Sequence, residues 1–399
     1  MVNSHIQKTK FQEIERCIVN SQPFVIPTET VYGLAAPADD PQAINMLYLI
    51  KNRPKDNPMI CHFDSIQQIE DYIDLDSTPS YWRDLAKQLS PGPITYFLPI
   101  KPNSAISPAL ANMTKAGCRI PNHPLALEII KSVGKPLAAP SANTSGRYSA
   151  TNFDMVQADL EDSVDCFIDG GDSVIGIEST TIDCIHEHEI VIYRPGYIGK
   201  ETIELALQAI GRSDVAVRFY EGLPPDDVTP GMKYKHYQPV TDLIQIDRDC
   251  LNFIAARRAF NSNTGFCLNF IKALEGDIVT RDCLNFIEAG AAKDSNHETS
   301  LNFTQAGEHT THNEKNDLIK ESDICYFIIS NKDYSILENC ILIPLDLKTI
   351  ASKMYSSLFK LDQINKQLIL LYLDPQISDL ADDPLYPAVM NRLNKITGN

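Results

Sequence analysis

The chain has 399 residues, of which 43% are hydrophobic and 22% charged, and its 35 Lys and Arg are outnumbered by 52 Asp and Glu, giving a formal net charge of −17. This ordinary globular composition excludes collagen-like, coiled-coil and disordered chains. Because a strongly acidic protein repels phosphate backbones, the charge argues against wrapping bulk DNA or RNA, and any site for an anion must be local.

The N-terminal segment, residues 1–16, mixes charged and polar residues with isolated apolar ones, so it lacks the apolar stretch of a secretory signal. The most apolar run, Leu368–Leu373, is far shorter than the roughly 20 residues that cross a bilayer. The 10 Cys include no Cys-x-x-Cys pair and no Cys/His cluster at zinc-ligand spacing. We therefore expect a cytoplasmic protein with reduced thiols, no membrane contact and no metal held by its own side chains.

Short apolar runs alternate with amphipathic ones from Phe11 to about Gly211, which predicts a mixed α/β domain. The predicted strands are residues 24–26, 59–63, 94–100, 137–139, 166–168, 180–184 and 190–193, and the predicted helices are residues 41–50, 80–89, 125–133 and 201–210. The first helix begins after Asp40 with Pro41 in its first turn, and the third ends at Gly134, a residue typical of a C-cap.

Residues 212–240 contain several Pro, Gly and Asp residues that break regular structure, so we interpret them as an interdomain linker. A second α/β unit is expected from residue 241. It is interrupted by a repeat, since the sequence DCLNFI at residues 249–254 returns at residues 282–287. A stacked repeat array is one interpretation. We favour an insertion at residues 249–320 that forms a surface excursion, because loops tolerate extra length at small entropic cost.

Polar side chains follow several predicted strands of the first domain. Residues 27–34 and 140–147 each hold hydroxyls and a Gly beside a carboxylate or a guanidinium, and Arg119, Ser179 and Arg194 lie next to further strands. Each feature alone is typical of a capping or surface residue. Together, in an acidic protein, they predict one positively charged cavity for a small polyanion.

The segment Lys51–Asn57 places three cations in five positions at the end of the helix predicted for residues 41–50. From charge alone, a solvated helix end whose cations complement the helix dipole is the favoured interpretation, and the polar neighbours shift the balance toward a binding site. The chain has neither a P-loop nor a Gly-x-Gly-x-x-Gly motif, so a nucleotide would need another device such as this one. No nucleophile with a partner base is evident, which favours positioning and electrostatic stabilisation of phosphate chemistry over covalent catalysis.

The motif TETVYGL at residues 28–34, the pair Lys51-x-Arg53 and the pair Ser141-x-Asn143 occur in the order found in the YrdC-like family of threonylcarbamoyl-AMP synthases, which the chain resembles. The resemblance covers residues 11–211. Residues 230–237 are similar to the linker of the family's two-domain branch, and residues 388–393 to the end of that branch's second domain.

The resemblance implies a twisted mixed-sheet YrdC-like domain with a central positively charged cavity at residues 8–211, a lid-forming linker at residues 212–240, and a smaller Rossmann-like domain at residues 241–399. It implies that L-threonine, bicarbonate and ATP, with Mg²⁺ on the phosphates, give threonylcarbamoyl-AMP and pyrophosphate. The product would pass to a tRNA threonylcarbamoyl transferase that modifies the adenosine next to the anticodon in tRNAs reading codons that start with A. Binding of tRNA itself is expected to be weak.

The resemblance also implies individual binding residues, with Arg119 suited to the amino-acid carboxylate. The L-threonine site would comprise Thr30, His62, Arg119 and Ser179. The ATP site would comprise Lys51, Arg53, Asn57, Ser141, Asn143, Ser149 and Arg194, of which Lys51, Arg53, Ser141 and Asn143 would also serve catalysis. Tyr234 in the linker would cover the nucleotide and exclude water.

Two departures from the family pattern bear on the second domain and the sheet. Lys115 stands where the family usually has a hydroxyl or apolar residue, and Asp382–Pro384 replaces a Gly-rich approach to the last helix.

Three alternatives remain open. A structured-RNA-binding module is disfavoured by the net charge and by the lack of an aromatic and basic stacking surface. A second alternative is that the protein handles a carbamoyl-adenylate, as do hydrogenase-maturation enzymes that contain the same domain. Those enzymes are much larger and carry zinc-binding and acylphosphatase-like regions that this sequence lacks. A degenerate paralogue conflicts with the intact motifs.

Overall fold

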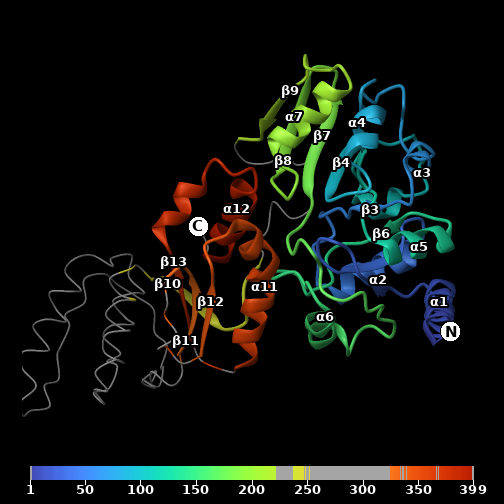
Figure 1. Cartoon of the computed structure of the whole chain (residues 1–399). Helices are drawn as coiled ribbons and strands as arrows, with labels where there is room; N and C mark the ends of the chain where they lie inside the picture. Colours follow the sequence, from blue (N-terminus) through green and yellow to red (C-terminus); the bar gives the residue numbers. More distant parts are fainter. Residues whose placement is uncertain are drawn as a thin grey trace, which may run out of the picture.

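The computed structural model describes residues 2–221, 237–246 and 324–397, apart from positions 333, 335, 336, 338, 365 and 367, together with Arg248 and Leu251. These residues form two α/β units, a larger first unit (residues 2–221) and a smaller second unit (the described residues from 242 on) (Figure 1). Tyr234 and nearly all of the predicted repeat insertion lie outside the described residues.

The first unit is built on a nine-stranded sheet with the order β1-β2-β6-β3-β5-β4-β7-β8-β9. The strands are β1 (Phe24–Ile26), β2 (Gly33–Pro37), β3 (Cys61–His62), β4 (Ile94–Pro99), β5 (Lys115–Arg119), β6 (Leu137–Ala138), β7 (Thr180–His186), β8 (Glu189–Arg194) and β9 (Ala216–Phe219). The β3–β5, β4–β7 and β8–β9 pairs are parallel and the other neighbours are antiparallel. The predicted mixed α/β class is confirmed.

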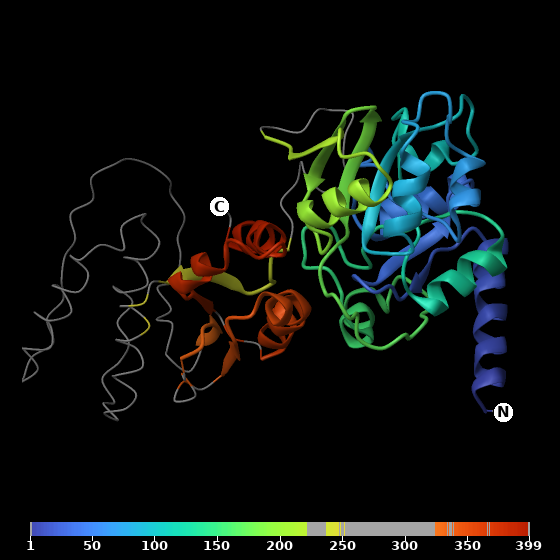
Figure 2. The same cartoon turned by 45° about the horizontal axis from the view of Figure 1, so that its top comes forward.

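Helices cover this sheet: α1 (Val2–Val19), α2 (Pro41–Ile50), α3 (Ile66–Glu70), α4 (Trp82–Leu89), the 3₁₀ helix η1 (Ser107–Leu110), α5 (Pro124–Val133), α6 (Phe153–Leu160) and α7 (Lys200–Ala209). Helix α2 starts as predicted, because the Asp40 carboxylate accepts hydrogen bonds from the backbone N–H groups of Gln42 and Ala43. Helix α5 ends at Gly134 in the left-handed conformation, with φ at 70°. Helix α1 lies at the end of the molecule far from the second unit (Figure 2).

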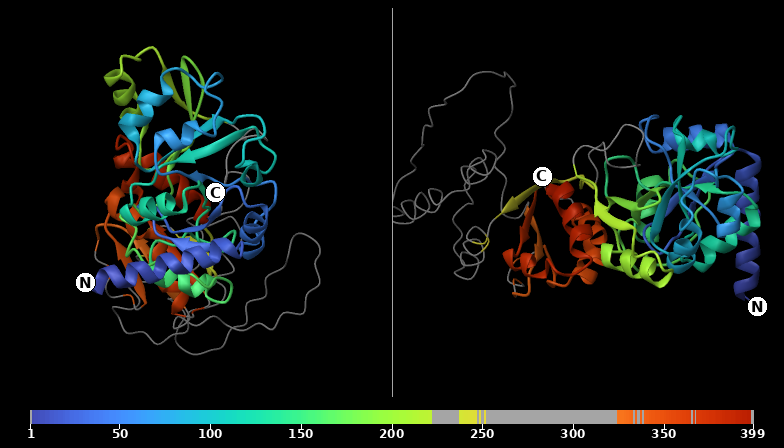
Figure 3. Two further views of the ribbon diagram at one scale, coloured as in Figure 1. Left: turned by 90° about the vertical axis from the view of Figure 1, so that its right-hand side faces the viewer. Right: turned by 90° about the horizontal axis from the view of Figure 1, so that it is seen from above.

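The second unit contains a four-stranded sheet with the order β10-β13-β11-β12, in which every neighbouring pair is parallel. The strands are β10 (Asp242–Ile246), β11 (Ile324–Ile329), β12 (Cys340–Ile343) and β13 (Leu368–Leu373), and the helices are α11 (Leu347–Gln363), η3 (Pro375–Leu380) and α12 (Tyr386–Thr397). Helices α11 and α12 lie on the face of the sheet that turns toward the first unit (Figure 3). No helix among the described residues is long and apolar enough to cross a membrane.

Several elements differ from the sequence-based prediction. Strands β2 and β5 were not predicted, because their sequences GLAAP and KAGCR have little β propensity and owe their burial to interior positions in the sheet. Residues 166–168 meet β1 through a single bridge between Phe167 and Val25 and form no regular strand. Strand β9 falls within the predicted linker, so the first sheet extends beyond residue 211. The predicted domain boundaries stay a prediction.

Both departures noted in the sequence have a structural account. Lys115 begins β5, and its ammonium forms an ion pair with the buried Asp183 carboxylate at 3.1 Å. Asp383 accepts a hydrogen bond from the backbone N–H of Leu385 at 2.8 Å, just before α12 begins. Pro384 contacts the first unit, since a Cβ added to Gly199 would lie 2.7 Å from the Pro384 Cβ.

The two units meet in a backbone contact that requires a glycine. Gly176 has φ at 77°, and a Cβ there would lie 2.6 Å from both the Ala351 carbonyl oxygen and the Ser352 Cα in α11. Gly171 has the same φ with no atom within 4 Å of such a Cβ. The loop before β7 therefore lies directly against α11.

We expect Gly176→Ala to destabilise the protein more than Gly171→Ala does. Both variants pay the left-handed backbone cost of about 1–2 kcal/mol, but only Gly176→Ala also forces the two units apart, at a further cost of about 1–3 kcal/mol. Denaturant unfolding of both variants measures the difference. Equal losses would contradict the close contact between the units.

Candidate active site

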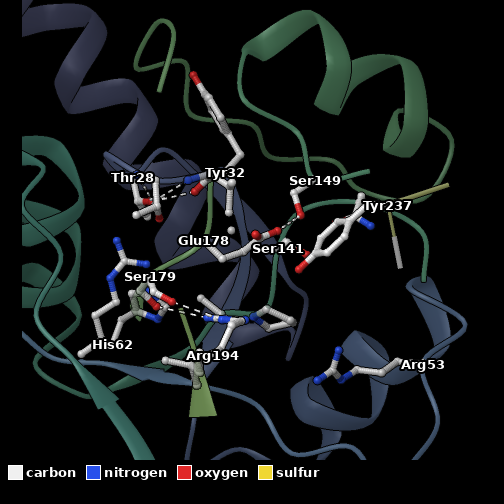
Figure 4. Close-up of a pocket in the computed structure, with 18 of the residues that line it drawn as sticks. Thr28, Tyr32, Arg53, His62, Ser141, Ser149, Glu178, Ser179, Arg194 and Tyr237 are labelled. Atoms are coloured by element: carbon white, nitrogen blue, oxygen red, sulfur yellow. Dashed lines mark hydrogen bonds between the residues drawn. The ribbon is translucent and has the colours of Figure 1, made fainter. Parts of the chain in front are cut away.

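A pocket lies in the first unit where the last residues of β3, β5 and β8 meet the segments that follow β1, α2 and β6 and the residues just before β7 (Figure 4). It encloses about 700 Å³ of empty space, counting the part open to solvent. Its lining comprises Thr28, Thr30, Val31, Tyr32, Gly33, Arg53, Ile60, His62, Arg119, Ala139, Pro140, Ser141, Asn143, Arg147, Ser149, Glu178, Ser179, Arg194 and Tyr237.

Most of the predicted ligand residues meet in this pocket. The lining includes all four residues predicted for L-threonine and five predicted for ATP, namely Thr30, His62, Arg119 and Ser179, and Arg53, Ser141, Asn143, Ser149 and Arg194. Lys51 and Asn57 are not among the lining residues. The structure therefore brings together residues that are distant in the sequence. Which ligand each of them binds stays a prediction.

At one end of the pocket lies an arginine with an N–H donor that has no hydrogen-bond partner. Arg119 is buried and forms an ion pair with the buried Glu29, whose Oε2 lies 2.8 Å from Arg119 Nη2. Its Nε–H has no hydrogen-bond partner. Because a buried donor without a partner is costly, this guanidinium edge is suited to an anionic ligand group.

His62 lies beside Arg119 as a neutral imidazole. Burial and the charge of Arg119 lower the pKa of His62 to about 3, and its Nδ1 has no hydrogen-bond partner. Near the loop, Thr28 Oγ1 lies 2.9 Å from Thr30 Oγ1 and donates to the Val31 carbonyl, a local turn that holds Thr30 at the pocket wall. A neutral ring and two hydroxyls therefore line the same pocket as Arg119.

We expect the free energy of unfolding of His62→Asn to fall less steeply in acid than that of the wild type. Because the folded-state pKa of about 3 lies below the ordinary value of about 6.5, the unfolded chain binds more protons between these two values, and stability falls as pH falls through that window. Between about pH 7 and pH 5 this contribution is about 2 kcal/mol. Urea unfolding of both proteins near these pH values measures it, and parallel pH dependences would contradict a buried neutral His62.

The middle of the pocket is held by an arginine and a serine. Arg194 is buried, and its Nη2 and Nε donate to the Ser179 hydroxyl and carbonyl oxygens, both at 3.2 Å (Figure 4). The Ser179 hydroxyl also lies 2.8 Å from the Thr95 hydroxyl. Burial lowers the pKa of Arg194. The pair places a fixed positive charge between the two predicted substrate sites.

Lys51 supports the loop that carries Ser141 and Asn143 without lining the pocket itself. It caps α2, is 1% exposed, and its ammonium donates to the Ser141 and Asn143 carbonyl oxygens. Burial and the charge of Arg53 lower the pKa of Lys51 to about 7. The side-chain Oδ1 of Asn143 is buried without a partner, so it can accept a hydrogen bond from a ligand. Lys51 therefore shapes the loop that carries Ser141 and Asn143.

Arg53 lies in the pocket wall, opposite Tyr237 in the view of Figure 4. Its Nη2 donates to Asn57 Oδ1 and to the Pro58 carbonyl, each at 2.7 Å, and its Nε donates to the Asn57 carbonyl at 3.1 Å. These contacts orient the guanidinium, so Asn57 acts on the pocket through Arg53.

Two lining residues, Glu178 and Tyr237, were missed among the predicted site residues, whereas Tyr32 and Arg147 belong to the polar segments 27–34 and 140–147 noted in the sequence. Burial alone would raise the pKa of Glu178, but the charges of Arg392 and Arg194 and the Ser149 hydrogen bond lower it to about 2. The available signals were adjacency to Ser179 for Glu178, and membership of the linker motif for Tyr237.

Among the described residues, no group of three or more His, Cys, Asp or Glu side chains is placed to hold a metal ion. A Mg²⁺ ion that arrives on ATP needs no such cage, because it is bound mainly by phosphate and water oxygens. The unpartnered Asn143 Oδ1 fits a water ligand of such an ion.

Fold and pocket together define a two-unit α/β protein with a small-molecule site in its first unit. Residues 17–196 match the Sua5/YciO/YrdC family, described as "Telomere recombination", and residues 198–398 match the family "Threonylcarbamoyl-AMP synthase, C-terminal domain". The chain belongs to the family of threonylcarbamoyl-AMP synthases.

Individual relatives agree with this assignment. The chain is 40% identical over 217 residues to the threonylcarbamoyl-AMP synthase of Bacillus subtilis, covering 54% of this chain and 61% of that protein. It is 36% identical over 248 residues to that of Pyrococcus abyssi, covering 62% and 70%. The fold matches the crystal structure of P. abyssi Sua5 complexed with L-threonine with a TM-score of 0.69 and 27% identity, covering 97% of this chain and 94% of that one.

Proposed function

We propose that the protein is a threonylcarbamoyl-AMP synthase that condenses L-threonine, bicarbonate and ATP and releases pyrophosphate. The observation that carries the proposal is the pocket itself, whose lining brings together Arg119 with an unpartnered Nε–H donor, neutral His62 and the Arg194–Ser179 pair. The match of this fold to a Sua5 structure complexed with L-threonine supports the amino-acid substrate.

The threonine end follows from charge and hydrogen bonding. The carboxylate of L-threonine would accept from the free Nε–H of Arg119. Because His62 is neutral, it can accept a hydrogen bond from the substrate amine or hydroxyl without repelling the ammonium form. Thr30 and Ser179 supply further hydroxyls at the wall.

The reaction requires three reactants to be aligned. The threonine amine attacks bicarbonate to give a carbamate and water, and a carbamate oxygen then attacks the α-phosphorus of ATP as the bond to the pyrophosphate oxygen breaks. The chain's contribution is positioning and fixed positive charge, from Arg53 and Arg194. Mg²⁺ would supply further charge neutralisation on the phosphates.

We infer that the product serves threonylcarbamoyl modification of the adenosine next to the anticodon in tRNAs reading codons that start with A. The adenylate would pass to a separate tRNA threonylcarbamoyl transferase. The net charge of −17 supports only weak direct binding of tRNA by this chain.

Pyrophosphate release from ATP by the purified protein tests the proposal. With Mg²⁺ present, we expect release only when L-threonine and bicarbonate are both added. Release that is independent of threonine would indicate plain ATP hydrolysis. No release, combined with tight tRNA binding at low salt, would favour an RNA-binding module instead.

A further inference from the structure

The second unit reaches the wall of the pocket through a buried arginine. Arg392 in α12 is 0% exposed, and its Nε lies 3.1 Å from Glu178 Oε2. Glu178 in turn lines the pocket and accepts a hydrogen bond from the Ser149 hydroxyl at 2.6 Å (Figure 4). A residue of the last helix is thus two contacts away from a side chain predicted to bind ATP.

Arg392 also holds the two strand ends that carry the centre of the pocket. Its Nη1 donates to the Pro195 carbonyl, and its Nη2 donates to the Glu178 carbonyl at 3.4 Å. Pro195 follows Arg194, and Glu178 precedes Ser179. The guanidinium therefore bridges the end of β8 and the start of β7 beside the Arg194–Ser179 pair.

The charge of Arg392 matters for an anionic ligand. A carboxylate in the pocket wall repels phosphate oxygens. Because Glu178 is buried, water does not screen its charge, so the charge must be balanced by another protein group. Arg392 neutralises this carboxylate through its ion pair with Glu178 Oε2. Tyr355 from α11 adds a hydroxyl 3.4 Å from Glu178 Oε2 and stacks on Tyr237, with ring centroids 5.3 Å apart.

We propose that Arg392 is a positioning residue for the reaction in the first unit: it neutralises Glu178, which holds Ser149, and it fixes the strand ends that carry Ser179 and Arg194. The second unit thereby completes the active site. The inference rests on the proposed function for the identity of the ligand.

The test compares Arg392→Met, Arg392→Lys and the double variant Arg392→Met with Glu178→Gln. We expect Arg392→Met to lower kcat/KM for ATP on the order of 10²-fold, because a small misplacement of binding groups has effects of this size. The KM for L-threonine should change less, because Ser149 and Arg194 are assigned to ATP and only Ser179 to L-threonine. Arg392→Lys should regain part of the lost kcat/KM for ATP, because lysine keeps the positive charge but lacks the planar guanidinium with its several N–H donors. The double variant should regain most of the folding stability, because it leaves no buried charge unpaired. Its KM for ATP should stay raised, because the bridge that Arg392 forms between the two strand ends is still missing.

Arg248→Met is the matched control. Arg248 forms another arginine–carboxylate pair within the second unit, with Nη2 2.8 Å from Asp374 Oδ1, and neither residue lines the pocket. We expect its KM for ATP to equal that of the wild type.

A purely structural role for Arg392 would lower only the fraction of folded enzyme, leaving both KM values unchanged in the molecules that remain folded, and this result would overturn the proposal. The dissociation constant for ATP is measured in parallel. If the wild type bound ATP but formed no adenylate, the proposed function would fail, and a weaker ATP affinity in Arg392→Met would still support the positioning role.

Discussion

Arg119→Lys is expected to raise the KM for L-threonine roughly 10- to 100-fold. A charge-assisted hydrogen bond contributes about 1.5–3 kcal/mol, and Lys keeps the positive charge beside Glu29 while losing the planar donor edge that fits a carboxylate. The KM for ATP should change much less, because Arg119 lies at the end of the pocket that we propose for L-threonine. Steady-state pyrophosphate release with each substrate varied in turn measures both constants.

The choice of Lys is dictated by burial. Arg119→Ala would leave the buried Glu29 without its partner, at a cost of about 3–5 kcal/mol in stability, so lost activity would not report on binding. Arg53→Lys serves as the reciprocal control, since we expect it to change the KM for ATP and not that for L-threonine. A threonine KM unchanged in Arg119→Lys would remove Arg119 from the substrate site.

Lys51→Met is expected to abolish turnover together with a large loss of stability. Met has nearly the length of Lys but no donor, so the buried Ser141 and Asn143 carbonyls each lose the Lys51 hydrogen bond. Each unsatisfied group costs about 1–3 kcal/mol, a large share of the roughly 5–15 kcal/mol that stabilises a typical protein. Urea unfolding and pyrophosphate release are measured on the same preparation.

Arg53→Gln provides the contrast to Lys51→Met. Arg53 is half-buried in the pocket wall and donates to Asn57 and Pro58, so we expect loss of turnover with a change in stability of only about 1 kcal/mol. If Lys51→Met instead kept wild-type stability, Lys51 would not be the support of the Ser141–Asn143 loop.

The parts of the fold that could be predicted from the sequence are those set by local chemistry. The Asp40–Pro41 start of α2 and the Gly134 end of α5 depend on a few adjacent residues, and both predictions are confirmed. Strands β2 and β5 could not be predicted because their small residues have little β propensity and become strand through pairing on both sides within the sheet.

The site shows the same division. Residues at strand ends could be placed near one another because consecutive strands of an α/β sheet bring such ends together. The depth of a side chain could not be predicted: Lys51 and Arg53 are two residues apart, yet Lys51 is 1% exposed behind the loop while Arg53 lines the pocket. The link from Arg392 to Glu178 spans 214 positions and arises only when the two units pack together.

The most direct test of the central claim is the fate of isotopically labelled bicarbonate. The purified protein is mixed with ATP, Mg²⁺, L-threonine and ¹³C-bicarbonate, and the nucleotide products are analysed by mass spectrometry. We expect threonylcarbamoyl-AMP that carries the label in its carbamoyl group. AMP or ADP without any labelled adenylate, from a protein that is folded and binds ATP, would contradict the proposed reaction.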